Sequence, residues 1–446
     1  MHYVDQILFP RWLIPVQDIN TEPGQQVLEQ HGVAVDNGRI VAVGPRQSIS
    51  ASYSSEIIVD LPQHALTPGL VNAHTHSSMT LLRGYSDDLP LMEWLSQHIW
   101  PAEAKWVNTE FVKAGTDLAI AEMIRSGTTC FNDMYFFPDI AASRCELAGM
   151  RACVGMIVLD FPTIWAGDAG EYISKGLQVR DDLRHSTLVS VAFAPHAPYT
   201  VSNAPLEKVA VLAEELDCQI HIHVHETSHE IEESNARFGM RPLERLDQLG
   251  LVGPHLVAVH MTQLLPAEIS TLAERGVNVV HCPQSNLKLA SGFCPVNSLL
   301  EQGINVAIGT DGASSNNDLD MLGEMQSAAL LAKTVAEDPA AMNAYHALYA
   351  ATKAGAISLG LEHEIGSIEV GKSADLVAFD LSDPATQPVF HPVSQLVYSA
   401  SRNQVSDVWI AGKKLLTDGK LTRMNLQAIL TEAREWGLKI QTGHTQ

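Results

Sequence analysis

The stretch Leu66–His76, LTPGLVNAHTH, decides how the rest of this chain is interpreted. It begins with an apolar run around a Pro-Gly pair and ends by presenting His74 and His76 two residues apart. Side chains at positions i and i+2 of a β-strand point to the same face, so the two imidazoles can bind one metal ion. A single His-x-His pair is also found at ordinary strand ends, and the prediction therefore depends on the residues at the ends of the other strands.

Eight short apolar segments from Leu70 onward are predicted to be strands buried on both faces, as in parallel sheets. They are Leu70–Ala73, Thr128–Asn132, Ala152–Val158, Leu188–Ala194, Gln219–Val224, Leu256–Val259, Val277–His281 and Val306–Ile308. Helical stretches lie between them, such as Phe111–Ser126 and Leu206–Leu216. Repeated strand–helix units predict an α/β fold, a (β/α)8 TIM-like barrel. An open doubly wound sheet is the alternative, but no G-x-G-x-x-G motif follows the first strand.

Both ends of the chain carry β-type patterns instead of long helical periods. An Asn-Gly pair at 37–38, between two apolar runs, is a strong hairpin signal. The predicted strands are Val33–Val35, Ile40–Val43, Ile57–Leu61, Ile368–Val370, Leu376–Asp380 and Val408–Lys414, and a last helix is predicted around Leu426–Leu438. We therefore expect two domains, a barrel of residues 66–366 and a small β-sandwich composed of residues 1–65 and 367–446.

Composition excludes several classes of protein. Hydrophobic residues make up 46% of the chain, so a large core can form. The net charge of −23, from 28 basic and 51 acidic residues, opposes binding to nucleic-acid phosphates. The six cysteines form no Cys-x-x-Cys pair, which is typical of free thiols in a reducing compartment. Without an apolar run of about 20 residues or a signal-peptide pattern, we expect a soluble cytoplasmic protein with no membrane partner.

The carboxyl ends of barrel strands are where such enzymes place their functional residues. Here those positions carry His74, His76, His196, His221, His223, His225, His260, His281 and Asp311, with Glu226 directly after the fifth strand. His74, His76, one fifth-strand histidine and Asp311 make a set of three nitrogens and one oxygen, which suits Zn²⁺ with room for a water. The three fifth-strand histidines alternate along one face, so spacing does not choose among them.

A bound divalent ion can lower the pKa of its water to about 7, so this set predicts metal-assisted hydrolysis. His281, taken by itself, is expected to be a hydrogen-bonded structural histidine.

Several motifs resemble those of the amidohydrolase superfamily, over nearly the whole chain. They are PGLVNAHTH, HIHVHET, VAVH, GTDGASSNN and GSIEVGKSADLV. A second set is similar to the 5′-methylthioadenosine/S-adenosylhomocysteine deaminases and the related cytosine deaminases, guanine deaminases and triazine hydrolases. It consists of LMEWL (91–95), PAE (101–103), PHAPYT (195–200), His223-x-x-Glu226 and PQSNLKLASG (283–292).

The resemblance implies one metal ion, zinc or a similar divalent ion, held by His74, His76, His223 and Asp311. Binuclear relatives use a carboxylated lysine at the end of the fourth strand. That strand ends here in Ala194–His196, without a lysine, which favours a single ion.

The resemblance also implies catalytic roles. Glu226 would move a proton to the ring nitrogen of the substrate, Asp311 would accept the proton of the metal-bound water, and His260 would orient the hydroxide. Glu103 would bind the ribose diol and Trp94 would form a wall beside the sugar. The other interpretation of these last two residues is an amphipathic lid helix. His196 would face the nucleoside.

We therefore expect a zinc-dependent hydrolase that replaces the exocyclic amine of an adenosine derivative with oxygen and releases ammonia. The expected substrate is 5′-methylthioadenosine, converted to 5′-methylthioinosine, with adenosine and S-adenosylhomocysteine as further substrates. Aminohydrolase or chlorohydrolase action on guanine, cytosine or a triazine is one alternative. A non-catalytic scaffold is another, but it would be expected to lack metal ligands. The expected partner is a small nucleoside, and relatives often self-associate into homo-oligomers.

The segment Val154–Ser174 bears on which adenosine derivative is preferred. In relatives that accept S-adenosylhomocysteine, arginines after the third strand are expected to hold the amino-acid carboxylate. This segment contains no Arg or Lys, offers Met156, Phe161, Ile164 and Trp165, and carries three acidic residues. It predicts efficient use of 5′-methylthioadenosine and adenosine and poor use of S-adenosylhomocysteine. Arg151, Lys175, Arg180 or a neighbouring subunit could supply the cation instead.

Overall fold

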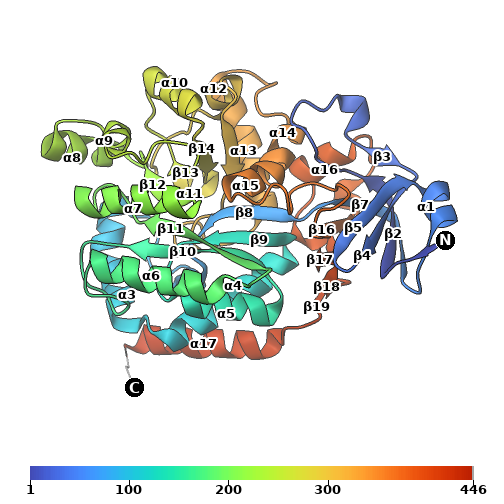
Figure 1. The fold of residues 1–446 in the computed structure, drawn as a ribbon, viewed down its shortest axis with the longest axis horizontal. Helices are drawn as coiled ribbons and strands as arrows, with labels where there is room; N and C mark the ends of the chain where they lie inside the picture. The colour runs from blue at the N-terminus through green and yellow to red at the C-terminus, as the bar shows by residue number, and fades with distance from the viewer. Residues whose placement is uncertain (444–446) are drawn as a thin grey trace.

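The computed structural model describes residues 1–443, and its centre is a barrel of eight parallel strands (Figure 1). They are β8 (Leu70–Thr75), β9 (Thr128–Asp133), β10 (Arg151–Val158), β11 (Val189–Pro195), β12 (Ile220–Val224), β13 (Leu256–His260), β14 (Asn278–His281) and β15 (Asn305–Ile308). Each strand pairs with its neighbours in chain order. The predicted (β/α)8 barrel is confirmed, and every strand lies within two residues of its predicted bounds.

The first and last strands meet where the barrel closes. The side-chain amide of Asn72 donates to Thr310 Oγ1 at 2.7 Å, and its oxygen accepts from the Thr310 backbone N–H at 2.9 Å. Gly309 permits this approach because a Cβ there would lie 2.7 Å from the backbone nitrogen of His74. The closure therefore brings His74 at the end of β8 next to Asp311, whose backbone N–H donates to the His74 carbonyl at 3.0 Å.

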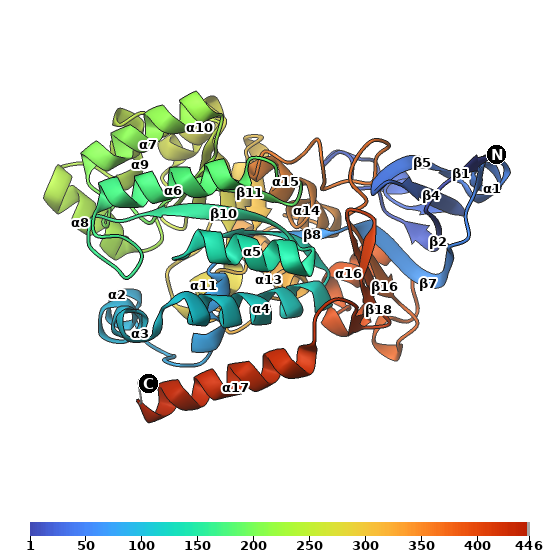
Figure 2. The ribbon, with the colours of Figure 1, turned by 60° about the horizontal axis from the view of Figure 1, so that its bottom comes forward.

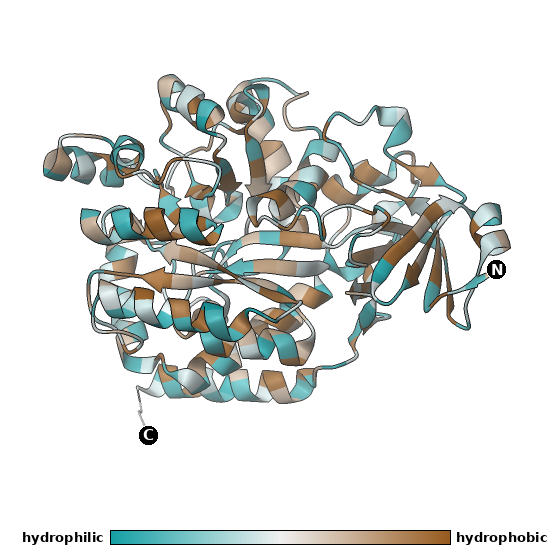
Figure 3. Cartoon of the chain, in the orientation of Figure 1, coloured by the Kyte–Doolittle hydropathy of each residue, from teal (hydrophilic) through white to brown (hydrophobic). Residues whose placement is uncertain are grey.

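Helices surround the barrel, and Figures 1 and 2 show them outside the strands. They are α4 (Thr109–Arg125), α5 (Pro138–Ala148), α6 (Ala169–Leu183), α7 (Asn203–Leu216), α8 (Ser228–Phe238), α9 (Pro242–Gln248), α10 (Pro266–Arg275), α11 (Pro283–Lys288), α12 (Val296–Glu301), α13 (Met321–Ala336), α14 (Ala344–Ala350) and α15 (Lys353–Ser358). Their amphipathic character appears in Figure 3 as bands of brown and teal. Local sequence sets their ends: the Asn108 side chain caps α4 by accepting from the Phe111 N–H.

A helical run crosses the mouth of the barrel between β8 and α4. It consists of η2 (Ser77–Leu82), α2 (Leu91–Glu93), the π-helical turn η3 (Trp94–Ile99) and α3 (Trp100–Trp106). Its apolar side packs into a buried cluster that includes Trp94, Ile99 and Trp106. We call residues 91–106 of this run the lid helix. Its apolar side is buried, as an amphipathic helix requires, and the substrate roles implied for Trp94 and Glu103 stay predictions.

The two chain ends form one sheet of nine strands. These are β2 (Gln6–Leu13), β3 (Leu28–Glu29), β4 (His31–Asp36), β5 (Arg39–Pro45), β7 (Ile58–Pro68), β16 (Leu376–Asp380), β17 (Val405–Ile410), β18 (Lys413–Thr417) and β19 (Lys420–Leu421). Strand β7 pairs with β2 on one side and with β16 on the other, so it joins the two ends. Trp409 of β17 is fully buried in one cluster with Leu8 and Val33, which gives both halves a common core.

Two predicted strands differ in the structure. Ile368–Val370 is irregular: the Ile368 N–H donates to the Pro15 carbonyl, and Gly366 and Gly371 on either side have φ of 87° and 96°. Such left-handed residues bend the backbone away from a ladder. Val408–Lys414 is divided between β17 and β18 by a turn at 411–412, where both residues have positive φ.

The last helix, α17 (Leu426–Thr442), leaves the nine-stranded sheet and packs against the barrel. Figure 2 shows it beside α4, and the ring of Trp436 meets that of Phe111 edge-on with centroids 5.3 Å apart. The proposed division into residues 66–366 and a composite of 1–65 with 367–446 stays a prediction. Among residues 1–443, no helix has both the length and the apolar character that a membrane crossing requires.

Candidate metal centre and active site

Four side chains from three parts of the barrel converge at its carboxyl end. His74 and His76 come from the end of β8, His223 from β12, and Asp311 follows β15. One nitrogen or oxygen atom of each lies within 4.8 Å of the others. Asp311 Oδ1 is 3.1 Å from His74 Nε2 and 3.2 Å from His76 Nε2, and the Nε2 atoms of His74 and His223 are 3.2 Å apart.

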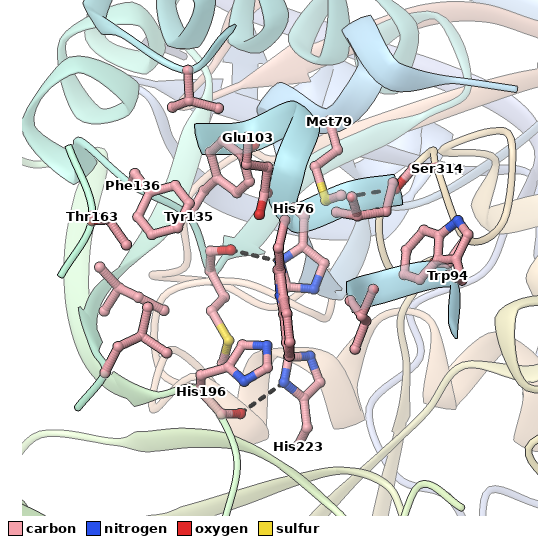
Figure 4. Close-up of a pocket in the computed structure, with 18 of the residues that line it drawn as sticks. His76, Met79, Trp94, Glu103, Tyr135, Phe136, Thr163, His196, His223 and Ser314 are labelled. Carbon is pink, nitrogen blue, oxygen red and sulfur yellow. Dashed lines mark hydrogen bonds between the residues drawn. The ribbon is translucent and has the colours of Figure 1, made fainter. Parts of the chain in front are cut away.

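Hydrogen bonds on the opposite ring nitrogens orient these imidazoles. His76 Nδ1 donates to the Met134 carbonyl at 2.6 Å, and His223 Nδ1 donates to the His196 carbonyl at 2.7 Å (Figure 4). His74 Nδ1 lies 2.8 Å from His221 Nε2. Bonds of this kind hold a ring in the tautomer that leaves Nε2 with a lone pair for a metal.

This donor set fits a divalent cation. Two ligand nitrogens, each about 2.1 Å from a tetrahedral zinc ion, would lie about 3.4 Å apart, close to the separations found here. Burial lowers the pKa of His74 to about 4, which suits a neutral ligand. Burial also acts to lower the pKa of His76, but its hydrogen bond with Asp311 raises it to about 9. The site therefore attracts positive charge, which a metal ion would supply.

The structure separates the three fifth-strand histidines. His223 joins the group of four, whereas His221 lies behind His74 and hydrogen-bonds to it. His225 follows the end of β12 with φ of 54°, and its Nε2 accepts from the Leu243 backbone N–H at 3.1 Å. Strand alternation alone does not reveal that His225 points elsewhere, because β12 ends at Val224 and His225 follows it.

Glu226 and His260 lie beside the four donors. Burial raises the pKa of the Glu226 carboxyl, and Glu226 Oε2 is 3.9 Å from His260 Nε2. His260 Nδ1 is held at 2.8 Å by Asn286 Oδ1. Ser285 Oγ donates to Asp311 Oδ2 at 2.6 Å. The sequence motif PQSNLKL contains Ser285 and Asn286, but sequence reasoning assigned neither residue a partner.

Backbone strain is concentrated at this end of the barrel. His225, His260 and Asp311 each follow or end a barrel strand with positive φ, at 54°, 77° and 64°. Non-glycine residues in this conformation cost free energy and persist where the surrounding structure enforces them, often at functional sites. His260 and Asp311 line the cavity described below, and His225 precedes Glu226, which also lines it, so the strain supports the placement of the site here.

A cavity of about 640 Å³ opens above the four donors. Trp94 and Glu103 from the lid helix, His196 from the loop after β11, and Glu226 all line it (Figure 4 labels Trp94, Glu103 and His196). Trp94 Nε1 donates to the Ser86 carbonyl at 2.9 Å, and His196 Nδ1 is 3.0 Å from Thr200 Oγ1. Apart from His74, which is fully buried beneath it, the residues predicted for metal or substrate binding all line the cavity, and its volume is in the usual range for a small-molecule site.

Glu103 faces the cavity beside Tyr135. Burial raises the pKa of the Glu103 carboxyl to about 7. The buried Tyr135 hydroxyl lies against this carboxyl, and its interaction with Glu103 acts to lower the Glu103 pKa against the larger effect of burial. Sequence reasoning did not select Tyr135, although its position two residues after β9 is a strand-end signal of the kind used for the histidines.

Apolar residues form the outer part of the cavity. Leu159, Phe161 and Ile164, all after β10, lie on one side, and the Phe161 ring is 6.2 Å from that of Trp100 on the lid helix. Within residues 1–443, the cavity lining contains no lysine or arginine.

His281 differs from its expectation. It is buried and stays outside the group of four donors, as expected of a structural histidine, but neither ring nitrogen has a hydrogen-bond partner among the residues described, so the expected hydrogen bond is wrong. Burial lowers its pKa to about 3, so the ring is neutral.

Comparisons with known proteins agree with this geometry. The model of the amidohydrolase family matches residues 65–415. A 5-methylthioadenosine/S-adenosylhomocysteine deaminase from Teredinibacter turnerae is 49% identical over 98% of both chains. The crystal structure of an adenosine deaminase from Xanthomonas campestris with bound zinc has a TM-score of 0.96 and 53% identity, with 99% of each chain covered. The zinc complex of an atrazine chlorohydrolase from Arthrobacter aurescens, at 22% identity and a TM-score of 0.88 over 97% of this chain and 100% of that one, shows the same fold.

The family model covers most of the chain, and the identities extend over nearly its full length. The chain therefore belongs to the amidohydrolase family, in the branch that contains the 5-methylthioadenosine/S-adenosylhomocysteine deaminases.

Proposed function

We propose that this protein is a zinc-dependent deaminase of adenosine derivatives, with 5′-methylthioadenosine as its preferred substrate. The observation that carries the proposal is one cavity with a four-ligand metal group and Glu226 at its floor and an apolar wall without cations farther out. The names of the relatives support the same reaction.

His74, His76, His223 and Asp311 hold the metal in this proposal. When bound, the ion supplies a Lewis acid that activates water at neutral pH. Asp311 accepts a proton from the attacking water. Its Oδ2 is held by Ser285 Oγ, which keeps the carboxylate directed at the other three ligands.

Glu226 carries the other proton transfer. The reaction adds the oxygen of water to the carbon that bears the exocyclic amine, and that amine leaves as ammonia. Protonation of the neighbouring ring nitrogen makes this carbon electrophilic, and a carboxyl group with a raised pKa is suited to donate that proton. His260, held by Asn286, directs Nε2 toward the same space and orients the water.

The rest of the cavity orients the nucleoside. Glu103 accepts hydrogen bonds from the ribose diol, Trp94 packs beside the sugar, and His196 faces the base. The 5′-methylthio group then lies against the apolar wall formed by Leu159, Phe161 and Ile164. An uncharged thioether matches that wall, whereas the zwitterionic end of S-adenosylhomocysteine would lose hydration without gaining a cation.

The basic residues near the wall have other partners. Lys175 Nζ donates to the Trp165 carbonyl at 2.6 Å and pairs with Glu171, and the nearest acid to Arg180 is Asp181 at 3.8 Å. Arg151 lies at the amino end of β10 and is bound to Asp375. The acidic residues of the segment 154–174 do not line the cavity, so repulsion by carboxylates contributes less than we expected.

A direct test measures ammonia release from the purified protein. 5′-Methylthioadenosine, adenosine and S-adenosylhomocysteine are compared by kcat/KM under one condition, with guanine, cytosine and a triazine as further candidates. We expect the first two to be used at least about ten times more efficiently than the third, the scale of one charge-assisted hydrogen bond. Turnover of a triazine or cytosine alone would refute the substrate assignment, and equal efficiency with S-adenosylhomocysteine would refute the argument from the apolar wall.

A further inference from the structure

One ammonium group, that of Lys288 at the end of α11, contacts two separate loops at the mouth of the barrel. Lys288 is the last residue of α11, and its Nζ donates to Asp87 Oδ1 at 2.6 Å, to the Ser314 carbonyl at 3.3 Å and to Asn317 Oδ1. Asp87 lies in the loop that leads from β8 to the lid helix, and Ser314 and Asn317 lie in the loop after β15. Lys288 itself does not line the cavity.

The contact with Asp87 reaches the cavity wall through one peptide unit. Ser86, the neighbour of Asp87, accepts the hydrogen bond from Trp94 Nε1, and the Trp94 ring lines the cavity. Ser314, whose carbonyl accepts from the ammonium, also lines the cavity, and so does Leu289, the residue after Lys288. Three parts of the wall are therefore linked through one side chain.

The ion pair between Lys288 and Asp87 can hold the two segments together because it is charged and partly buried. The side chains of Lys288 and Asp87 are 21% and 34% exposed, and the hydrogen bond from Lys288 lowers the pKa of Asp87. Asn317 Nδ2 also donates to Asp87 Oδ2 at 3.3 Å. Charge-assisted hydrogen bonds of this kind are roughly twice as strong as neutral ones.

We propose that Lys288 is a positioning residue for substrate binding. It holds the segment 86–87, and through that segment Trp94, against the loop after β15, so that the cavity keeps the width that a nucleoside needs. The inference rests on the proposed function. Without the link, the Trp94 wall would lose its anchor, whereas the Glu226 backbone, held by the Glu230 carboxylate, and the His260 ring, held by Asn286, would keep their geometry.

The test replaces the ammonium and measures KM and kcat separately. For Lys288→Met we expect KM for 5′-methylthioadenosine to rise roughly 10-fold while kcat changes less than about 2-fold and zinc content stays the same. Asp87→Asn should raise KM similarly, and the double variant should not exceed the larger single effect, because both changes break one link. Lys288→Arg should restore part of the loss.

Lys113→Met is the matched control, because Lys113 forms an exposed ion pair with Glu110 at 3.5 Å away from the cavity. It should leave KM unchanged. The proposal would be overturned if KM were unchanged in Lys288→Met, if the loss were confined to kcat, or if zinc were lost. Additive effects of Lys288→Met and Asp87→Asn on KM would overturn it as well. If Lys288→Met does not fold, Asp87→Asn and Lys288→Arg provide the same comparison. A native protein inactive on 5′-methylthioadenosine would instead contradict the proposed function.

Discussion

At the scale of the residue, each of the four candidate metal ligands supplies one donor atom to the same metal site. We expect His74→Ala or Asp311→Ala to abolish turnover and to lower bound zinc well below one ion per chain, since three donors bind more weakly than four. Elemental analysis of the purified variants, together with an ammonia assay, measures both effects. His363→Ala, with a side chain 92% exposed, is the control and should keep metal and activity. Full activity with metal retained in either site variant would contradict the assignment.

Glu226 is expected to transfer a proton and not to bind the metal. Glu226→Gln preserves the shape of the side chain but removes the titrating group, so we expect the metal to remain and kcat to fall on the order of 100-fold or more, as for a positioned general acid. The control is Glu232→Gln, on the exposed side of α8, which should change neither quantity. Loss of zinc from Glu226→Gln would identify Glu226 as a ligand instead.

At the scale of the element, the loop after β10 determines what the outer end of the cavity accepts. Ile164 lines the cavity and is 65% exposed, so an arginine there can reach the space that the 5′ substituent occupies. We expect Ile164→Arg to raise kcat/KM for S-adenosylhomocysteine on the order of 10-fold and to lower it for 5′-methylthioadenosine, through a new charge-assisted pair. Ile164→Gln separates the charge from the loss of apolar surface. If both variants changed the two substrates alike, the wall would not select by charge.

At the scale of the whole molecule, one buried ion pair joins the barrel to the nine-stranded sheet. Arg151, at the start of β10, donates to both carboxylate oxygens of Asp375, at 2.7 and 3.1 Å, and the two side chains are 5% and 1% exposed. Arg151→Met leaves the Asp375 charge buried and unpaired, which costs about 3–5 kcal/mol. We expect a lower midpoint of unfolding in urea, with kcat retained because the pair lies at the opposite end of β10 from the site.

The exposed pair of Arg39 and Glu364 offers a matched comparison, since its side chains are 47% and 42% exposed. Arg39→Met should change the free energy of unfolding by no more than about 1 kcal/mol. Equal destabilisation by the two substitutions would show that burial does not set the strength of the Arg151 pair.

The sequence by itself determined the barrel and the types of residue at its carboxyl end. Apolar runs buried on both faces, separated by helical periods, are local patterns, and they located all eight strands from β8 to β15. The predicted strand at 368–370 failed because flanking glycines in left-handed conformations bend the chain, and apolar composition does not report backbone angles. The resemblance to a family, and not spacing, selected His223 among three histidines.

Only the tertiary structure decided how these residues combine. Alternation sets which face of β12 a histidine occupies, but its depth depends on the neighbouring strands, and this depth places His221 behind His74 and His223 beside it. The ammonium of Lys288 meets Asp87, 201 residues away in the chain, and Trp436 of the last helix meets Phe111 of α4. Contacts of this kind join residues that are far apart in the chain, and local patterns locate the strands and helices without showing which of their side chains will meet.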